Sequence, residues 1–270
     1  MNKQRLLTGH DVEPMSEEWL TKMAEEQSTF RHGVVRILPD GWLYPSNTPR
    51  FLNRIQSFKF RPDDVIVMMF PKSGTTWMQE KLWTMLFNPN LDNPQATQPL
   101  RVRSASISMD MLLDAVKLEE LHLKTLYETL KKLCPGKNVD DGVGVQCLDA
   151  MPGQRVIKCL YPLDLMPPDL LDKTKMSLIT TLLSKSVYLA NPQGELRKLN
   201  QFLATGLTEQ QLKNVVQHTS FSSMKSRGDA IPDNNLDSKE LHQLTGGVFR
   251  KGRTQYSLLK QSFSSDGKVV

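Results

Sequence analysis

Residues 65–76 read Val-Ile-Val-Met-Met-Phe-Pro-Lys-Ser-Gly-Thr-Thr, and this stretch decides the fold. Its first six residues form a continuous apolar run, rich in β-branched side chains, which is typical of a parallel strand buried on both faces. Pro71 ends the run, and small residues lead into a helical pattern over residues 77–87 that Asn88 and Pro89 close. This order of strand, short loop and helix is the unit from which parallel sheets are built.

Further along the chain, strand and helix patterns continue to alternate. Residues 155–159 predict a second short strand, and residues 108–133 carry leucines and valines at helical spacing. Asn191-Pro192 and Thr208-Glu-Gln-Gln211 are start signals for two more helices. The sequence therefore predicts an α/β fold in a single domain, with a central, mainly parallel sheet flanked by helices.

The ends of the chain are more polar than its middle. Residues 1–40 are interrupted by polar residues, and we expect an N-terminal arm with one helix over residues 16–30. Residues 38–50 combine prolines with Trp42 and Tyr44, which predicts an ordered loop packed on a surface. We expect the α/β domain to span residues 41–255 and a polar tail to span residues 256–270.

Composition excludes several classes of protein. The chain has 270 residues, of which 39% are hydrophobic and 23% charged, so a disordered or coiled-coil protein is excluded. No apolar run approaches the roughly 18 residues of a membrane helix, and no apolar stretch follows the basic N-terminus. A net charge of +5 is too small and dispersed for nucleic-acid binding but suits a small polyanion. Three separated cysteines form neither a disulfide framework nor a metal motif, so we expect a cytoplasmic protein with no membrane or nucleic-acid partner.

The loop between the first strand and its helix has the composition of an anion site. Gly74 allows close approach of the backbone, Thr75 and Thr76 offer hydroxyls, and Lys72 supplies a compact positive charge at a helix N-terminus. The loop is not a Walker A motif, because the lysine precedes the glycine. The alternative is a solvated turn whose two threonines cap the helix.

The string Pro71-Lys-Ser-Gly-Thr-Thr-Trp77 resembles the nucleotide-binding loop of the cytosolic sulfotransferases. Those enzymes transfer a sulfuryl group from 3′-phosphoadenosine 5′-phosphosulfate to a hydroxyl or an amine. Three further strings match in the family's order, and they are Val156-Ile-Lys158 with Pro162-Leu-Asp-Leu-Met-Pro167, His218-Thr-Ser-Phe-Ser-Ser-Met-Lys225, and Phe249-Arg-Lys-Gly252. The resemblance covers residues 41–175 and 192–252.

The resemblance implies a role for each matching residue. Lys72 and Lys158 take the catalytic positions, where Lys72 stabilises charge on the bridging oxygen as the sulfuryl group leaves and Lys158 helps to hold that group. For Lys158, a strand-end lysine reaching solvent is the alternative. The sulfated nucleotide is the implied co-substrate, the acceptor is a small molecule, and no metal is required. The implied nucleotide-binding residues are Lys72, Ser73, Gly74, Thr75, Thr76, Trp77, Thr219, Phe221, Met224, Arg250, Lys251 and Gly252.

The sequence departs from the family pattern in three places. Leu160 stands where the family has its general-base histidine, and a leucine accepts no proton. Residues 176–191 stand where the family continues with a strand, an arginine-bearing turn and a helical segment, so this stretch either replaces the strand or leaves the fold incomplete. The sequence after Gly252 also diverges. We therefore expect a sulfotransferase of impaired activity or, as the alternative, an inactive nucleotide-binding relative. A small-molecule kinase explains only the first loop.

Overall fold

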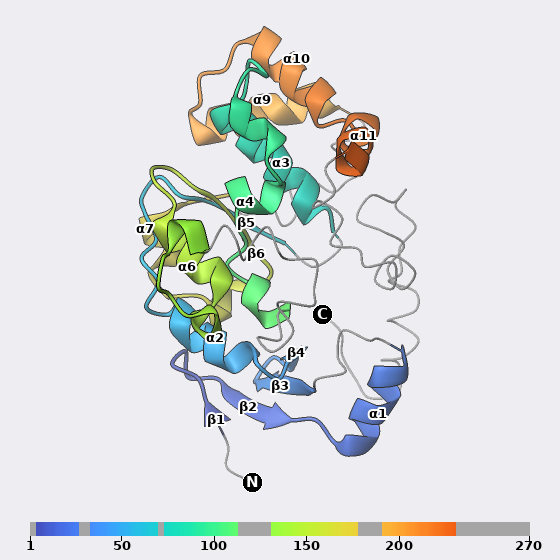
Figure 1. Ribbon diagram of the computed structural model, residues 1–270, viewed down its shortest axis with the longest axis vertical. Helices are drawn as coiled ribbons and strands as arrows, with labels where there is room; N and C mark the ends of the chain where they lie inside the picture. Colours follow the sequence, from blue (N-terminus) through green and yellow to red (C-terminus); the bar gives the residue numbers. More distant parts are fainter. Residues whose placement is uncertain (1–3, 27–32, 70–72, 113–130, 178–190, 231–270) are drawn as a thin grey trace.

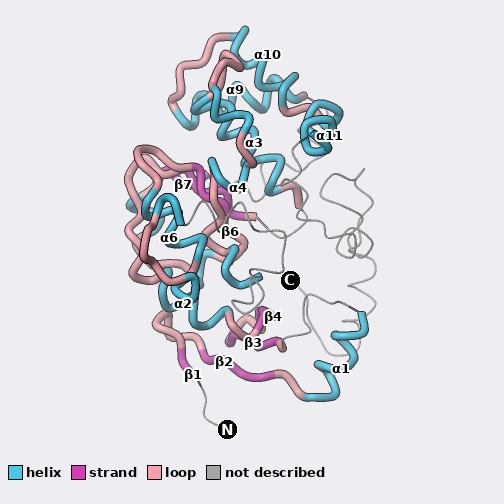
Figure 2. The backbone as a smooth tube through the Cα atoms, in the orientation of Figure 1, coloured by secondary structure: helices cyan, strands magenta, loops and turns pink. Residues whose placement is uncertain are grey.

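The computed structural model describes residues 4–26, 33–69, 73–112, 131–177 and 191–230 (Figure 1). Its strands form two sheets, one antiparallel in the order β1-β2-β3-β4 and one parallel in the order β6-β5-β7. Figure 2 shows the parallel strands in the middle of the molecule, between one group of helices and the N-terminal sheet. The structure confirms the α/β architecture predicted from the sequence. No helix among the described residues is long and apolar enough to cross a membrane.

The central strand is β5 (Val65–Met68), as the apolar run predicted. It pairs in parallel with β6 (Val156–Cys159) on one side and with β7 (Lys175–Ser177) on the other. All four of its residues are buried, and they alternate between two apolar cores. Ile66 and Met68 enter one core, while Val65 and Val67 enter the other, because successive side chains of a strand point to opposite faces. A strand in this position must be apolar throughout.

Three helices cover one face of the parallel sheet: α3 (Thr75–Phe87), α9 (Pro192–Leu203) and α10 (Glu209–His218) (Figure 1). The predicted start signals are confirmed at both later helices. The Asn191 side chain accepts a hydrogen bond from the Gly194 N–H, and Thr208 and Gln211 form a capping box. Such caps satisfy N–H groups that have no partner within a helix.

The opposite face packs against the N-terminal sheet and the helices α2 (Thr48–Ile55) and α6 (Val143–Ala150). The sheet consists of β1 (Gln4–Arg5), β2 (Asp11–Pro14), β3 (Val34–Leu38) and β4 (Trp42–Pro45). Leu6, Val12 and Ile37 from this region are buried in the shared core. The sequence predicted only a helix here, which is present as α1 (Glu17–Glu26), and it predicted a loop where β4 lies. The predicted domain boundaries stay a prediction.

Short elements complete the described chain. They are η2 (Pro94–Thr97), α4 (Leu100–Arg103), η3 (Met109–Leu112), η5 (Val139–Asp141), η6 (Leu163–Leu165), α7 (Leu170–Lys173) and α11 (Phe221–Ala230). Most of the helix predicted over residues 108–133 lies outside the described residues. All three cysteines are buried free thiols.

The strand that the sequence left in doubt is present. Lys175, Met176 and Ser177 pair with Val65, Ile66 and Val67 as β7, so the parallel sheet continues past β5. A sequence beginning with a lysine and only three residues long gives no apolar pattern, and its strand conformation follows from pairing with β5. Residues 178–190 lie outside the described chain.

Candidate functional site

The helix α3 begins immediately after the predicted anion loop. Gly74 is its N-cap, with a φ of 107°, a left-handed value that a residue with a Cβ rarely adopts. Ser73 is exposed and Thr75 is buried. A glycine at this position turns the chain sharply from strand to helix and directs the positive end of the helix dipole toward the loop. Lys72, which precedes it, lies outside the described residues.

Trp77 joins this loop to the predicted motif at residues 218–225. Its indole Nε1 donates a hydrogen bond of 2.6 Å to the carbonyl oxygen of Thr219, at the junction of α10 and α11. The ammonium group of Lys81 lies 3.5 Å from the centroid of the Trp77 ring. Lys81 is fully buried, and that burial lowers the pKa of its ammonium group well below the usual value. Two segments 142 residues apart, each carrying predicted nucleotide-binding residues, therefore meet at Trp77.

The motif at residues 218–225 contains three predicted nucleotide-binding residues, and their side chains differ in exposure. Thr219 is buried, and its hydroxyl donates a 2.7 Å bond to the Val215 carbonyl. Phe221, the first residue of α11, exposes a large part of its ring. Met224 is buried one turn later. Of the three side chains, Phe221 is the one most accessible to a ligand as the structure stands.

Lys158 lies near the carboxyl end of β6. Its backbone is opposite Val67 of β5, and on the other side its N–H donates to the Ala105 carbonyl at 3.1 Å. Strand alternation places its side chain on the same face as Val156, which packs in the core beneath α3. Ligands of open parallel sheets bind beyond the carboxyl ends of the strands. The structure thus places Lys158 and the start of α3 at the same edge of one sheet.

Position 160 carries no proton acceptor, and Cys159, Tyr161 and Tyr44 do not supply one. Leu160 packs against the core between the parallel sheet and the N-terminal sheet. Its N–H donates to Ser108 Oγ at 3.0 Å. Burial raises the pKa of Cys159 to about 12, and burial also raises the pKa values of Tyr44 and Tyr161 far above their usual range. Cys159 and Tyr161 point into the core, as the alternation of an extended segment predicted. None of these groups accepts a proton at neutral pH.

One helical turn after Trp77, a buried carboxylate contacts two arginines and a histidine from three elements. Glu80 of α3 receives Arg103 of α4 at 2.5 Å, His218 of α10 at 3.3 Å, and Arg227 of α11 at 3.6 Å. Burial would raise the pKa of Glu80, but the bond from His218 and the charges of the two arginines outweigh it and hold that pKa below its usual value. Arg227 also donates to the His218 carbonyl at 2.8 Å. Glu80 therefore fixes the α10–α11 junction against α3.

A family model described as "Sulfotransferase domain" matches residues 62–181 and 187–264. The chain belongs to the sulfotransferase domain family. The match includes the strand–loop–helix, Lys158 and the Thr219 segment, and its interruption falls within the stretch 176–191 that departs from the pattern. The expectation of family membership is confirmed.

Individual sulfotransferases resemble the chain at moderate identity. Sulfotransferase 1A1 of Rattus norvegicus is 23% identical over 234 residues, covering 63% of this chain and 70% of the relative. Luciferin sulfotransferase of Photinus pyralis is 22% identical over 272 residues, covering 77% and 70%. A solved structure of retinol dehydratase in complex with retinol and PAP superimposes with a TM-score of 0.69 at 19% identity, covering 97% of this chain and 98% of that one. This last likeness shows a shared fold.

Sequence reasoning about this sulfotransferase missed the charged centre at Glu80. A signal was present, because Gln79, Glu80 and Lys81 are consecutive in an otherwise apolar helix. Three consecutive helical residues, at about 100° each, cover more than half of the helix circumference, so they do not all face solvent. All three are buried. The predicted clamp residues Arg250, Lys251 and Gly252 lie outside the described residues, as Lys72 does.

Proposed function

We propose that this sulfotransferase binds 3′-phosphoadenosine 5′-phosphosulfate and transfers its sulfuryl group to a hydroxyl or amine of a small molecule. The observation that carries the proposal is the hydrogen bond from Trp77 to Thr219, which joins the anion loop to the adenine-side segment. Relatives with sulfotransferase names and a fold neighbour solved with PAP support the same donor. A cytoplasmic location, with neither membrane nor nucleic acid as a partner, is part of the proposal.

The proposed reaction assigns a task to each group. Ser73, Gly74, Thr75 and Thr76 hold the phosphosulfate, and Trp77 packs on the adenine. The bond between sulfur and the bridging oxygen breaks, and Lys72 stabilises the charge left on that oxygen. The acceptor atom forms the new bond to sulfur while Lys158 holds the transferring group. Thr219, Phe221 and Met224 line the nucleotide, Arg250, Lys251 and Gly252 bind its 3′-phosphate, and no metal takes part.

We propose further that turnover is slow. With Leu160 at the base position, the acceptor proton passes to water, and loss of a general base typically costs about 10²- to 10⁴-fold in rate. Acidic phenols, which ionise in water, are then better acceptors than aliphatic alcohols. A small-molecule acceptor agrees with the retinol and androsterone complexes of the fold neighbour. Leu160 also favours the second candidate, a homologue that binds the nucleotide without turnover.

Binding of the desulfated nucleotide tests the donor site directly. In a thermal-shift titration of the full chain, 3′-phosphoadenosine 5′-phosphate at 100 times its Kd should stabilise the folded state by about 2.7 kcal/mol, which raises Tm by about 5 °C or more. Adenosine 5′-phosphate, which lacks the 3′-phosphate, is the matched ligand and should give a smaller shift. An equal or absent response to both nucleotides would contradict the proposed site.

Turnover separates the two candidates. We expect slow appearance of a sulfated phenol when the chain is incubated with the sulfated nucleotide and a phenol, and none for the variant Lys72→Met. Nucleotide binding without any product would establish the second candidate in place of the first.

A further inference from the structure

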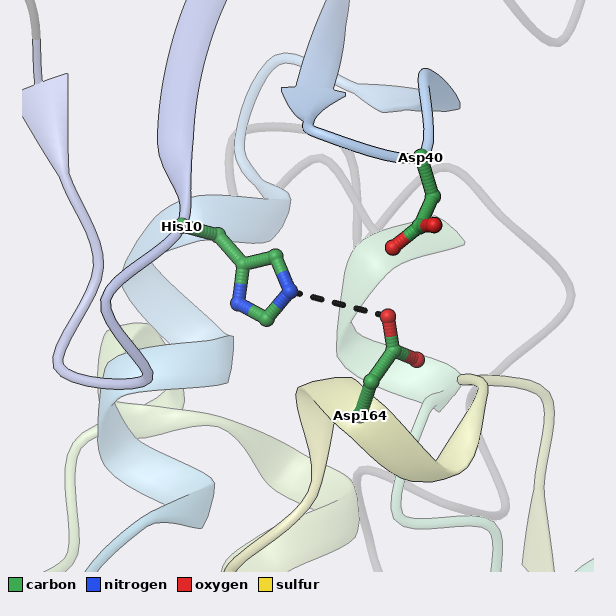
Figure 3. Close-up of side chains that lie close together, drawn as sticks. All are labelled: His10, Asp40 and Asp164. Atoms are coloured by element: carbon green, nitrogen blue, oxygen red, sulfur yellow. Dashed lines mark ion pairs between the residues drawn. The ribbon is translucent and has the colours of Figure 1, made fainter.

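Outside the donor site, three potential metal ligands converge from three separate parts of the chain (Figure 3). His10 precedes β2, Asp40 lies in the turn between β3 and β4, and Asp164 lies in η6. One ligand atom from each residue lies within 4.8 Å of the others. Figure 3 shows the His10 ring and both carboxylates directed toward the same space. This convergence links the N-terminal sheet to the segment that follows β6.

The histidine is held in an orientation suited to a ligand. Its Nδ1 is 2.8 Å from the Thr8 hydroxyl, and its carbonyl accepts a 2.8 Å bond from the Leu6 N–H. The side chain is only 12% exposed, and its Nε2 faces Asp164 at 3.5 Å. Metal-binding histidines are oriented in this way, with one ring nitrogen bound to a neighbouring polar group and the other directed at the metal.

Neither carboxylate is neutralised by a lysine or arginine in the described part of the chain. No lysine or arginine among those residues forms an ion pair with Asp40 or Asp164, and His10 alone lies near both. Both carboxylates are exposed, so they can rotate toward a common centre at little cost. Ligands about 2.0–2.2 Å from a tetrahedral zinc ion lie roughly 3.3–3.6 Å apart. The 3.5 Å between His10 Nε2 and Asp164 already matches this spacing.

We propose that His10, Asp40 and Asp164 bind one divalent transition-metal ion of the Zn²⁺ type. An imidazole with two carboxylates favours such an ion over Mg²⁺ or Ca²⁺, which prefer oxygen ligands alone. Water completes the coordination. The ion ties the N-terminal sheet to η6, which begins three residues beyond Leu160, and thereby stabilises the packing between them. The ion takes no part in the proposed sulfuryl transfer. The proposed metal site does not depend on the proposed sulfotransferase function.

Calorimetric titration of the tag-free, chelator-treated full chain with ZnCl₂ tests the site, using three variants. Asp40→Asn removes an exposed ligand while keeping the His10–Asp164 pair, so it should fold normally and lose most of the zinc affinity. Thr8→Val should weaken binding about tenfold through the ring orientation. Asp149→Asn removes an exposed carboxylate elsewhere and should bind zinc as the native chain does. One equivalent bound by the native chain, with this order among the variants, supports the site.

Two results would overturn the proposal. One is zinc binding that is absent in the native chain or unchanged by Asp40→Asn. The other is a thiolate-to-metal charge-transfer band when Co²⁺ replaces Zn²⁺, since such a band would assign the ion to a cysteine. A weak visible Co²⁺ spectrum without that band, lost in Asp40→Asn, is the expected result.

Discussion

The indole Nε1 of Trp77 donates a 2.6 Å hydrogen bond to the carbonyl oxygen of Thr219. Thr219 is almost fully buried, so its carbonyl has little access to water as a substitute partner. The bond therefore fixes the distance between the start of α3 and the α10–α11 junction. It also sets the orientation of the ring on which the adenine is proposed to pack.

Trp77→Phe should weaken nucleotide binding while the protein stays folded. Phenylalanine keeps an aromatic face but leaves the Thr219 carbonyl without its donor, which costs about 1–3 kcal/mol. We expect the Kd for 3′-phosphoadenosine 5′-phosphate to rise about tenfold in calorimetry. Trp42→Phe, the same change in β4, is the control and should leave that Kd as it is. Equal effects of the two variants would contradict the assignment.

Glu80→Gln should destabilise the protein strongly. The substitution leaves Arg103 buried and His218 and Arg227 without their negative partner, and breaking a buried pair typically costs about 3–5 kcal/mol. Urea unfolding measures this loss. Glu209→Gln removes an exposed pair with Arg197, which water screens, and should cost far less. Acid gives a second test, because the pKa of Glu80 is lowered in the folded state. Its stabilisation is present at neutral pH and lost as the pH falls through that value, so only the native chain should show this loss.

Lys81→Met should flatten the dependence of stability on alkaline pH. Burial lowers the pKa of Lys81 in the folded state, so the unfolded chain binds a proton more readily and stability rises as the pH increases toward about 10. Methionine has a similar volume and no proton to exchange. We expect the difference in Tm between variant and native chain to favour the variant at pH 6 and to shrink at pH 9. A constant difference would show that Lys81 does not titrate abnormally.

Asp64→Asn should lower the free energy of unfolding more than the substitution of an exposed residue does. Arg155 donates to both Asp64 oxygens, at 2.8 and 2.5 Å, and both residues are fully buried where β5 and β6 begin. Leaving Arg155 without its counter-charge should cost about 3–5 kcal/mol in urea unfolding. Asp63→Asn, on the exposed neighbour, should have almost no effect. Similar losses for both variants would contradict a role of the buried pair.

The parts of the fold that the sequence predicted carry their own local signals. The run at residues 65–68 is apolar because both faces are covered, and Thr208 and Gln211 cap α10 without help from distant residues. The strands that the sequence did not predict adopt their conformation through pairing with neighbouring strands. In β3, Arg36 breaks an apolar run on an exposed face, and β7 is a three-residue strand that exists through its pairing with β5. Pairing of this kind is not encoded within the segment itself.

The same distinction applies to the candidate site. Gly74, Trp77, Lys158 and Thr219 were predicted because each stands in a motif with characteristic neighbours. Glu80 was missed because its partners come from residues 103, 218 and 227, and their convergence follows from how α3, α4, α10 and α11 pack. The ligand set at His10 likewise joins residues up to 154 positions apart, His10 and Asp164, which no spacing rule connects.

Leu160→His should raise the rate of sulfonation if the missing base limits turnover. Leu160 is partly exposed at the end of β6, with its N–H bound to Ser108 and its carbonyl near the Tyr44 hydroxyl at 3.4 Å. A histidine of similar size keeps these backbone bonds and adds a group that accepts protons near neutral pH. We expect the rate with an aliphatic alcohol to rise by about 10²-fold or more. That rate should decrease at pH values below about 6.5, because the new imidazole becomes protonated.

Leu160→Gln, which has a polar side chain but no such titration, is the matched control and should stay slow. A rate for the histidine variant no higher than that of the glutamine variant would show that something other than the base limits the reaction.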